Sequence, residues 1–402
     1  MSELSYLEKL LDGVEVEWVT LGSMADIGTG SSNRQDESEN GIYPFYVRSK
    51  NILKSDTFEF DEVAIVIPGE GGIGDIFHYV EGKYALHQRA YRIRITTNAV
   101  DTKFLYYFMS SSFKQYILTK SVGATAISIR KPMLEGFKVP IPSPDNPEKS
   151  LAIQSEIVRI LDKFTALTAE LTAELTAELT MRKKQYNYYR DQLLSFEQGE
   201  VEWKTLGEIA KIQRGASPRP IAQYMTDADD GIPWIKIGDT SSGSKYINGT
   251  AQKVTPDGAK KSRILNPGDF VISNSMSFGR PYILSITGAI HDGWASISDF
   301  SERLDSDYLY HYLSSQRVKN YWGSKINSGS VSNLNADIIK TLPLPLPDIQ
   351  KQKWIATLLD KFDTLTSSIS EGIPREIELR QKQYEYYRDL LFSFPKSEAA
   401  SN

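Results

Sequence analysis

The chain contains no cysteine among its 402 residues. Disulfides, thiolate metal sites and cysteine nucleophiles are therefore excluded, and a reducing cytoplasm is the compartment we expect. Histidine is scarce as well, and His78, His87, His291 and His311 include no closely spaced pair of the kind that binds zinc. The sequence has no run approaching the roughly 20 apolar residues that cross a bilayer. Its N-terminus lacks the basic and apolar segments of a signal peptide.

Motifs of catalysis are also missing from the sequence. No Walker-type phosphate loop occurs, which argues against a motor. Gly69–Gly74 fits G-x-G-x-x-G, but a strand-like segment follows it, so a hairpin turn is favoured over a dinucleotide site. Carboxylates are scattered without a nuclease-like or methyltransferase-like cluster. We therefore expect an isolated chain without catalytic activity, metal or bound cofactor.

A helical repeat stands at the middle of the chain, where Thr-Ala-Glu-Leu is written three times over residues 168–179. These residues favour a helix, and no Gly or Pro interrupts them. A spacing of four places the leucines on one helical face, drifting by roughly 40° per repeat. The pattern fits a helix packed on another helix as well as a rigid spacer. The candidate spacer residues are Leu167, Leu171, Leu175 and Leu179.

The rest of the chain is a tandem duplication. Val16–Gly22 returns as Val201–Gly207, Leu161–Phe164 as Leu359–Phe362, and Arg182–Asp191 as Arg380–Asp389. The last two pairs share one offset (359 − 161 = 198 and 380 − 182 = 198), so the intervening helical segment has one length in both copies. Repetition on this scale indicates one ancestral unit used twice.

Two divergent regions, roughly 19–145 and 204–347, lie between the repeated blocks. Phe104–Ser111 corresponds to Tyr308–Ser315 and Ala85–His87 to Ala289–His291, so both regions share one fold with different surfaces. Short apolar or alternating runs predict strands, whereas Leu105–Leu118 and Leu309–Trp322 predict amphipathic helices. The runs predicted as strands are Val63–Pro68, Tyr91–Ile95, Asp269–Ser273 and Pro281–Ile286. Without a regular βαβ alternation, the fold class is α+β.

A helix should follow each divergent region after its proline-rich end. Asn146 with Pro147, and Asp348 in the second copy, are suitable caps. The first helix is predicted to run unbroken to about Phe196. The second should break at Glu371–Arg375, because Pro374 cannot continue a helix.

Both divergent regions are slightly basic, with fourteen Lys/Arg against thirteen Asp/Glu in 19–140 and sixteen against thirteen in 204–342. Arginine can read guanine in the major groove and lysine serves phosphate, although ordinary solvated charge explains any single site equally well. His87 and His291 recur at matching positions, which favours a structural role over a base contact. The candidate DNA-binding residues are His87, Arg92, Arg94, Thr125, Arg130, Lys131, Lys260, Lys261, Arg263, His291, Arg317, Lys319, Ser330 and Asn333.

The most closely repeated residues are tyrosines and arginines near the ends of the two helical blocks. Such residues are enriched in binding hot spots, and two near-identical surfaces predict two copies of one partner. The candidate docking residues are Tyr186, Tyr188, Tyr189, Arg190, Tyr384, Tyr386, Tyr387 and Arg388.

The alternation of divergent and repeated blocks, together with the Thr-Ala-Glu-Leu run, the two Leu-Asp-Lys-Phe segments and the two Tyr-Tyr-Arg-Asp segments, resembles the specificity subunit of type I restriction–modification systems. Within that family the motifs are similar to the type IC, EcoDXXI-like class. The resemblance covers the whole chain and is strongest in the repeated blocks.

This resemblance implies two α+β target-recognition domains separated by two long antiparallel, coiled-coil-like helices. It implies boundaries at 1–145, 146–197, 198–347 and 348–395, with a disordered tail at 396–402. It further implies that each domain reads one half of a bipartite, asymmetric double-stranded DNA site. Two modification and two restriction subunits would be partners, carrying S-adenosylmethionine, ATP and Mg. We also expect the N-terminal segment from Tyr6 to pack beside the last helix.

Two other functions stay open at the level of sequence. One is a stand-alone two-domain DNA-binding or scaffolding protein, and the other is a nuclease with an unrecognised carboxylate site. Sequence-specific binding by the pure monomer would favour the first, and metal-dependent cleavage of DNA would favour the second.

Overall fold

The computed structural model describes residues 6–72, 74–120, 128–197, 199–240, 243–274, 279–300, 302–327, 334–368 and 371–395. It divides into two compact units, Met1–Leu171 with Arg380–Asn402, and Thr172–Leu379. Each unit holds one divergent region and a part of both long helical blocks. The domain boundaries drawn from the sequence stay a prediction, as does the tail at 396–402, which lies outside the described residues. No helix within the described ranges is long and apolar enough to cross a membrane.

Unit 1 is built around a six-stranded sheet in the order β2-β7-β5-β6-β3-β4. Neighbouring strands are antiparallel except β3 and β6, which are parallel. A separate ribbon pairs β1 with β8. The strands are β1 (Val16–Thr20), β2 (Ala25–Thr29), β3 (Tyr43–Tyr46), β4 (Leu53–Ser55), β5 (Phe60–Pro68), β6 (His78–Leu86), β7 (Ala90–Ile95) and β8 (Lys138–Pro142). The helices within this region are α1 (Tyr6–Leu11), α2 (Thr102–Lys120) and α3 (Lys131–Glu135).

Unit 2 repeats the ribbon, as β9 with β20, and carries two five-stranded sheets in the orders β10-β19-β16-β17-β13 and β11-β14-β12-β18-β15. Its strands are β9 (Glu202–Thr205), β10 (Lys211–Arg214), β11 (Met225–Thr226), β12 (Ile232–Ile235), β13 (Tyr246–Ile247), β14 (Lys253–Val254), β15 (Arg263–Leu265), β16 (Phe270–Ser273), β17 (Pro281–Leu284), β18 (Gly288–Ile290), β19 (Trp294–Ser298) and β20 (Pro343–Leu346). Its shorter helices are α5 (Leu206–Ile209), α6 (Pro256–Lys260), α7 (Ser306–Leu313), α8 (Gln316–Asn327) and α9 (Ala336–Lys340). The α+β class is confirmed.

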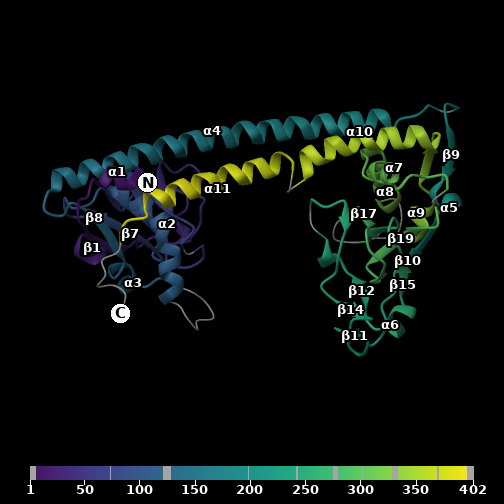
Figure 1. The fold of residues 1–402 in the computed structure, drawn as a ribbon, viewed down its shortest axis with the longest axis horizontal. Helices are drawn as coiled ribbons and strands as arrows, with labels where there is room; N and C mark the ends of the chain where they lie inside the picture. Colours follow the sequence, from purple (N-terminus) through teal and green to yellow (C-terminus); the bar gives the residue numbers. More distant parts are fainter. Residues whose placement is uncertain are drawn as a thin grey trace. The chain divides into compact units, whose positions relative to one another are not determined.

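The first helical block is the continuous helix α4 (Pro147–Leu193), seen in Figure 1. Its start is capped as predicted, because the Asn146 side chain accepts the Lys149 amide at 3.0 Å. The second block is two helices, α10 (Ile349–Ser367) and α11 (Ile373–Leu391), so the predicted interruption is confirmed, but it lies before Pro374, which belongs to the first turn of α11. Asp348 caps α10 by accepting the amides of Gln350 and Lys351.

The helical blocks are antiparallel within each unit. In unit 1, Phe164 of α4 packs on Tyr387 of α11. The hydroxyl of Thr165 donates a hydrogen bond to the hydroxyl of Tyr384. In unit 2, the equivalent pair is Tyr189 of α4 stacked on Phe362 of α10. Residue numbers rise on one helix where they fall on the other, which is the expected direction. Leu171, Leu175 and Leu179 are half-buried, whereas Leu167 is exposed.

The N-terminal segment packs beside the last helix, as expected. Leu7 and Leu11 share one buried cluster with Leu391, Phe392 and Phe394 at the end of α11. The indole of Trp18 also donates to the carbonyl of Pro395 at 2.9 Å. In unit 2, Leu194 and Phe196, which follow α4, lie in the corresponding core.

One predicted helix is wrong in extent. Leu309–Trp322 was expected to be continuous, but α7 ends at Leu313 and α8 begins at Gln316. The buried Ser315 provides the reason, because its hydroxyl accepts the amide of Val318 and so starts a new helix. The hydrophobic periodicity continues across this break, so it did not reveal that the helix ends. The break depends on a single hydroxyl, that of Ser315.

Candidate nucleic-acid interface

A histidine turn links two strands at the same place in each unit. His87 lies between β6 and β7, and His291 lies between β18 and β19. The Nδ1 atom of His87 accepts the Arg89 amide at 3.0 Å, and that of His291 accepts the Gly293 amide at 2.9 Å. In His87 the accepting Nδ1 places the ring proton on Nε2, whereas Nδ1 of His291 also lies 3.1 Å from Oδ1 of Asp292. Both histidines are therefore structural parts of their turns, as the duplication favoured.

The strands around the histidine turns match in register. Phe45 and Tyr46 of β3 pair in parallel with Ala85 and Leu86, and the same geometry recurs between β12 and β18. The backbone amide of His87 donates to Tyr46, and that of His291 donates to Ile235. Tyr46 and Ile235 are thus equivalent positions. The two divergent regions share this frame although few of their side chains agree.

A tight loop covers each histidine turn. Gly30 follows β2 and Gly215 follows β10, and a Cβ atom on them would lie 1.8 Å from Leu86 O and 2.1 Å from His291 O, respectively. Only glycine fits such approaches. Each glycine opens a Gly-x-Ser-x-Arg segment, 30–34 and 215–219. This repeat was not predicted, because only three of its five residues, Gly, Ser and Arg, are the same in both copies.

Beside the turn of unit 1 lies a pocket of about 580 Å³. Arg34, Arg48, Ser49, Glu70 and His87 are among its lining residues. Glu70 accepts from Arg48 at 2.9 Å and also from Arg89, at 3.2 Å. Burial, together with the charges of Arg48 and Arg89, lowers the pKa of His87, so its ring is neutral at pH 7. The pocket thus presents fixed donors beside one carboxylate.

Unit 2 places a carboxylate in the turn itself. Asp292 follows His291 and accepts from the Ser217 hydroxyl at 3.1 Å. Its other oxygen lies 3.6 Å from the guanidinium of Arg219, and its carbonyl accepts from Arg214. An arginine and a carboxylate therefore stand over both frames. Arg34 and Arg219 end matching Gly-x-Ser-x-Arg segments, whereas the carboxylates Glu70 and Asp292 come from different positions. None of these arginines was singled out from the sequence.

Arg92, a candidate from the sequence, has another task. Its side chain is only 14% exposed, forms ion pairs with Asp26 at 2.7 Å and Glu62 at 3.2 Å, and stacks over Phe60. The hydrogen bond from Arg92 lowers the pKa of Asp26. These contacts hold β2, β5 and β7 together, so Arg92 has little surface left for DNA. Arg94 lies on the same face of β7, 3.6 Å from Glu62, but its side chain is 48% exposed, and the sequence pattern could not reveal this difference in exposure.

The remaining candidate cations have other surroundings, although Arg263 pairs with Ile290, directly before His291. Lys131, Lys260 and Lys261 have partners close in sequence or space, respectively Glu135, Asp257 and Tyr224. The guanidinium of Arg317 lies over the Trp203 ring at 4.9 Å. The candidates with exposed surface are Arg94, Arg130, Lys131, Lys260, Lys261, Arg263, Arg317 and Lys319. Thr125, Ser330 and Asn333 lie outside the described residues. DNA contact by any of these stays a prediction.

A buried glutamine joins each divergent region to its long helix. Gln154 of α4 accepts the Asp101 amide at 2.8 Å and donates to Ala99 O at 3.0 Å. Gln352 of α10 makes the same two bonds, to the Asp305 amide and Arg303 O. Both amides are essentially fully buried. They fix the start of α2 and of α7 against the helical block.

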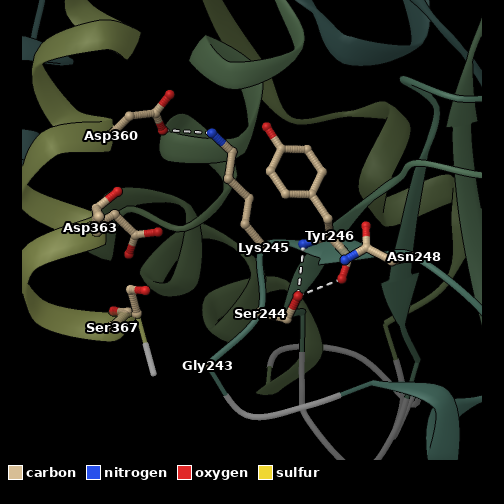
Figure 2. Close-up of a pocket in the computed structure, with 10 residues that line it drawn as sticks. Gly243, Ser244, Lys245, Tyr246, Asn248, Asp360, Asp363 and Ser367 are labelled. Carbon is tan, nitrogen blue, oxygen red and sulfur yellow. Dashed lines mark hydrogen bonds and ion pairs between the residues drawn. The ribbon is translucent and has the colours of Figure 1, made fainter. Parts of the chain in front are cut away.

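An aspartate of each Leu-Asp-Lys-Phe segment makes a second junction. In unit 1, Asp162 accepts from Tyr107 and Lys103, both at 2.7 Å. In unit 2, Asp360 accepts from His311 at 2.8 Å and from Lys245 at 2.6 Å. Figure 2 shows Lys245 reaching toward Asp360 of α10, beside Tyr246. The same socket thus receives different side chains from the two divergent regions.

The aspartate in unit 2 is charged despite its surroundings. Burial alone would raise the pKa of Asp360, but the hydrogen bonds from His311 and Lys245 lower it below the usual value. His311 is fully buried and accepts the Tyr186 hydroxyl on its other nitrogen, at 2.9 Å. Lys245 also pairs with Asp307 at 2.6 Å. This network connects α4, α7, α10 and the segment at β13.

Only some of the eight predicted docking residues are exposed. Tyr186 and Arg190 are 8% and 5% exposed and belong to the core of unit 2, so they are not available to a partner. Tyr188 and Tyr386, at equivalent positions, are 60% and 62% exposed. Tyr189 and Tyr387 expose about two-fifths of their surface while packing on Phe362 and Phe164. Two matched tyrosine pairs remain as candidate docking surface. Tyr384 and Arg388 are half-buried beside the second pair.

The described residues contain no group of three or more His, Asp or Glu side chains placed to hold a metal ion. Their chemistry is that of positioned donors and acceptors on two repeated frames.

Comparison with known proteins gives consistent matches over the whole chain. The family described as type I restriction modification DNA specificity domain matches residues 13–181 and 199–379. The EcoR124I/EcoR124II specificity subunit of Escherichia coli is 38% identical, with all of both chains covered. The EcoprrI specificity subunit of Escherichia coli is 35% identical over 92% of this chain and 93% of that one. A solved chain from work on complex assembly and conformational transition of the type I R-M system has a TM-score of 0.62 at 15% identity, covering 94% and 97%.

We predict that Gly30→Ala lowers the free energy of unfolding by about 1–3 kcal/mol, because its Cβ would overlap the Leu86 carbonyl. Gly28→Ala, two residues earlier and within β2, is the control. The nearest atoms to its Cβ belong to the Arg92 guanidinium, at 3.8 Å. Urea unfolding of the full chain measures both variants, and equal losses would contradict the steric argument.

We predict that Asp360→Asn lowers the free energy of unfolding by about 1–2 kcal/mol at pH 7. This is below the value for a fully buried pair, because the Asp360 side chain is 38% exposed. Since folding lowers the pKa of Asp360, its contribution is present above the unfolded pKa and is lost as pH falls through the folded one. The difference from wild type should therefore shrink below about pH 4.

Asp363→Asn, one turn further along α10, is the matched control for charge. Denaturant unfolding at pH 7 and pH 3 compares the two variants. A loss for Asp360→Asn that is independent of pH would show that the carboxylate charge is not what stabilises the junction.

Proposed function

Because the chain belongs to the type I restriction–modification DNA specificity family, we propose that its divergent regions are target-recognition domains, each reading one half of a bipartite, asymmetric DNA site. One observation supports this most directly. The two regions share a backbone frame at the histidine turns but carry different carboxylates beside it, and the pocket of unit 1 adds Arg48. A common frame with different donors and acceptors suits two domains that read two different sequences.

We propose a non-catalytic role within a larger complex. Two modification subunits would carry S-adenosylmethionine and methylate adenine, and two restriction subunits would carry ATP and Mg. The matched, exposed pairs Tyr188–Tyr189 and Tyr386–Tyr387 support two equivalent docking sites for the modification subunits. The complex would act in the cytoplasm, where its DNA is. The quoted Thr-Ala-Glu-Leu and Tyr-Tyr-Arg-Asp motifs support the type IC class.

A stand-alone DNA-binding or scaffolding protein is the alternative function. It requires tight sequence-specific binding by the pure chain. In that case the exposed tyrosine pairs would have no partner to meet.

We expect the chain alone to bind DNA poorly and to gain specific binding when two adenine methyltransferase subunits co-purify with it. Sequencing of methylated adenines in cells that carry the complex should then show one bipartite motif with an unread spacer. Tyr188→Ala with Tyr386→Ala should reduce co-purification by at least tenfold, since each residue belongs to an exposed aromatic pair.

Trp354→Ala, which removes an exposed aromatic side chain that is not repeated, is the control for this double variant, because residue 156 is glutamate in the first copy. Tight binding to one bipartite site by the chain without any partner would contradict the proposed assembly.

We also propose that the Thr-Ala-Glu-Leu run sets the length of the unread spacer. Deletion of Thr176–Leu179 would shorten α4 by about 6 Å and turn it by roughly 40°. DNA rises about 3.4 Å and turns by roughly 34–36° per base pair, so the rotation matches one pair. We expect methylation to move to sites whose spacer is one base pair shorter, with both half-sites unchanged. Changed half-site bases in this deletion would exclude a spacing role.

A further inference from the structure

The two divergent regions allow their side chains to be sorted by what they can read. If the regions read different half-sites, residues shared by both frames cannot decide which bases differ. Arg34 and Arg219 are shared, because both end the Gly-x-Ser-x-Arg segment. Arg48 is not shared. Tyr46 is equivalent to Ile235 by its bond from the histidine turn, so two residues later Arg48 corresponds to Ile237.

Arg48 is held in place by its neighbours in the pocket of unit 1. One of its terminal nitrogens donates to Glu70 at 2.9 Å, and 43% of its side chain is exposed. The adjacent Ser49 carbonyl lies 3.2 Å from the imidazole of His78. Among the described residues, the Arg48 guanidinium has no other hydrogen-bond or ion-pair partner. Its remaining donors are therefore available toward the pocket.

Glu70 is equally well placed. Its backbone forms a β-bridge with Ser128, and the neighbouring Gly69 carbonyl accepts the Ile129 amide at 2.8 Å. The bonds from Arg48 and Arg89 both end on one carboxylate oxygen of Glu70, Oε2. The Oε1 atom has no hydrogen-bond partner within the described part of the chain. The mouth of the pocket therefore presents a guanidinium donor and a carboxylate acceptor side by side.

This combination distinguishes between the ligands that DNA offers. A phosphate accepts hydrogen bonds only, and Glu70 would repel it. A G·C pair presents two acceptors on guanine and one amino donor on cytosine in the major groove. Arginine matches the first and a carboxylate matches the second. The pocket therefore fits a base pair better than the backbone.

We propose that Arg48 and Glu70 read one G·C base pair of the half-site bound by unit 1. Arg48 donates to O6 and N7 of guanine, and Glu70 accepts from N4 of cytosine. The inference rests on the proposed function and adds to it the residues and the base pair. Unit 2 has Ile237 at the Arg48 position, so it cannot make this contact there. Arg34, which both units share, is left to contact the backbone that all sites have.

The test is methylation by the complex of the full chain with its modification subunits, on a plasmid library with randomised half-sites. Arg48→Ala should convert one G·C position of one half-site to any base. Methylation of the original site should fall roughly 5- to 150-fold, which corresponds to about 1–3 kcal/mol for a bidentate contact. Glu70→Gln should change the preference at that same position and at no other.

Three further variants serve as comparisons. Lys50→Ala removes a charge from the same exposed loop and should leave every recognised base unchanged. Arg34→Ala should slow methylation of all sites alike, without a change in motif. Arg48→Lys keeps the charge but loses the two-donor geometry, so it should also relax the same base pair. The Arg48→Lys variant keeps the proposal testable if the Arg48→Ala chain does not assemble with the modification subunits.

An active Arg48→Ala or Arg48→Lys complex with an unchanged motif would overturn the proposal, while leaving the proposed function intact. Effects of Arg48 and Glu70 variants at different base pairs would also overturn it. By contrast, a wild-type complex that methylates no bipartite motif would refute the proposed function itself.

Discussion

The buried bonds of Gln154 and Gln352 constrain how each divergent region sits on its helical block. Each glutamine accepts one amide and donates to one carbonyl at the start of the neighbouring helix. A partner that moved away would leave buried polar groups unpaired, which costs about 1–3 kcal/mol for each group. The geometry is therefore strongly preferred, and it is the same in both units. The residues repeated in the two helical blocks therefore attach each divergent region to its helix in the same way.

The contacts of Asp162 and Asp360 show how this attachment accommodates sequence differences between the two divergent regions. Asp162 receives Tyr107 and Lys103 from one helix, whereas Asp360 receives His311 from α7 and Lys245 from the segment at β13. In each case two side-chain donors, one of them a lysine, meet one carboxylate. The aspartate keeps its role as an acceptor in both units, while the donor residues come from different positions of the divergent regions. This allows the divergent regions to vary without losing their attachment.

Much of the fold could be predicted because duplication and local signals agreed. The caps at Asn146 and Asp348 and the interruption just before Pro374 followed from residue types with strong backbone preferences. The candidate site was harder to predict. Arg92 and Arg94 alternate as a basic strand should, yet Arg92 is an internal ion-pair partner. Charge in a sequence does not show which acceptors lie across the sheet, because these come from residues 30 to 66 positions away.

The frames at the histidine turns were missed for a related reason. Gly30 and Arg34 gain meaning only when Leu86 and His87 are brought against them by β-pairing. Once the frames are aligned, the chain separates into two kinds of position. Residues shared by both frames hold geometry, and a change in them should affect either half of a site in the same way. Residues that differ, such as Arg48 and Ile237, can alter one half alone. A duplicated scaffold therefore permits the two recognition surfaces to change independently of each other and of the distance between them.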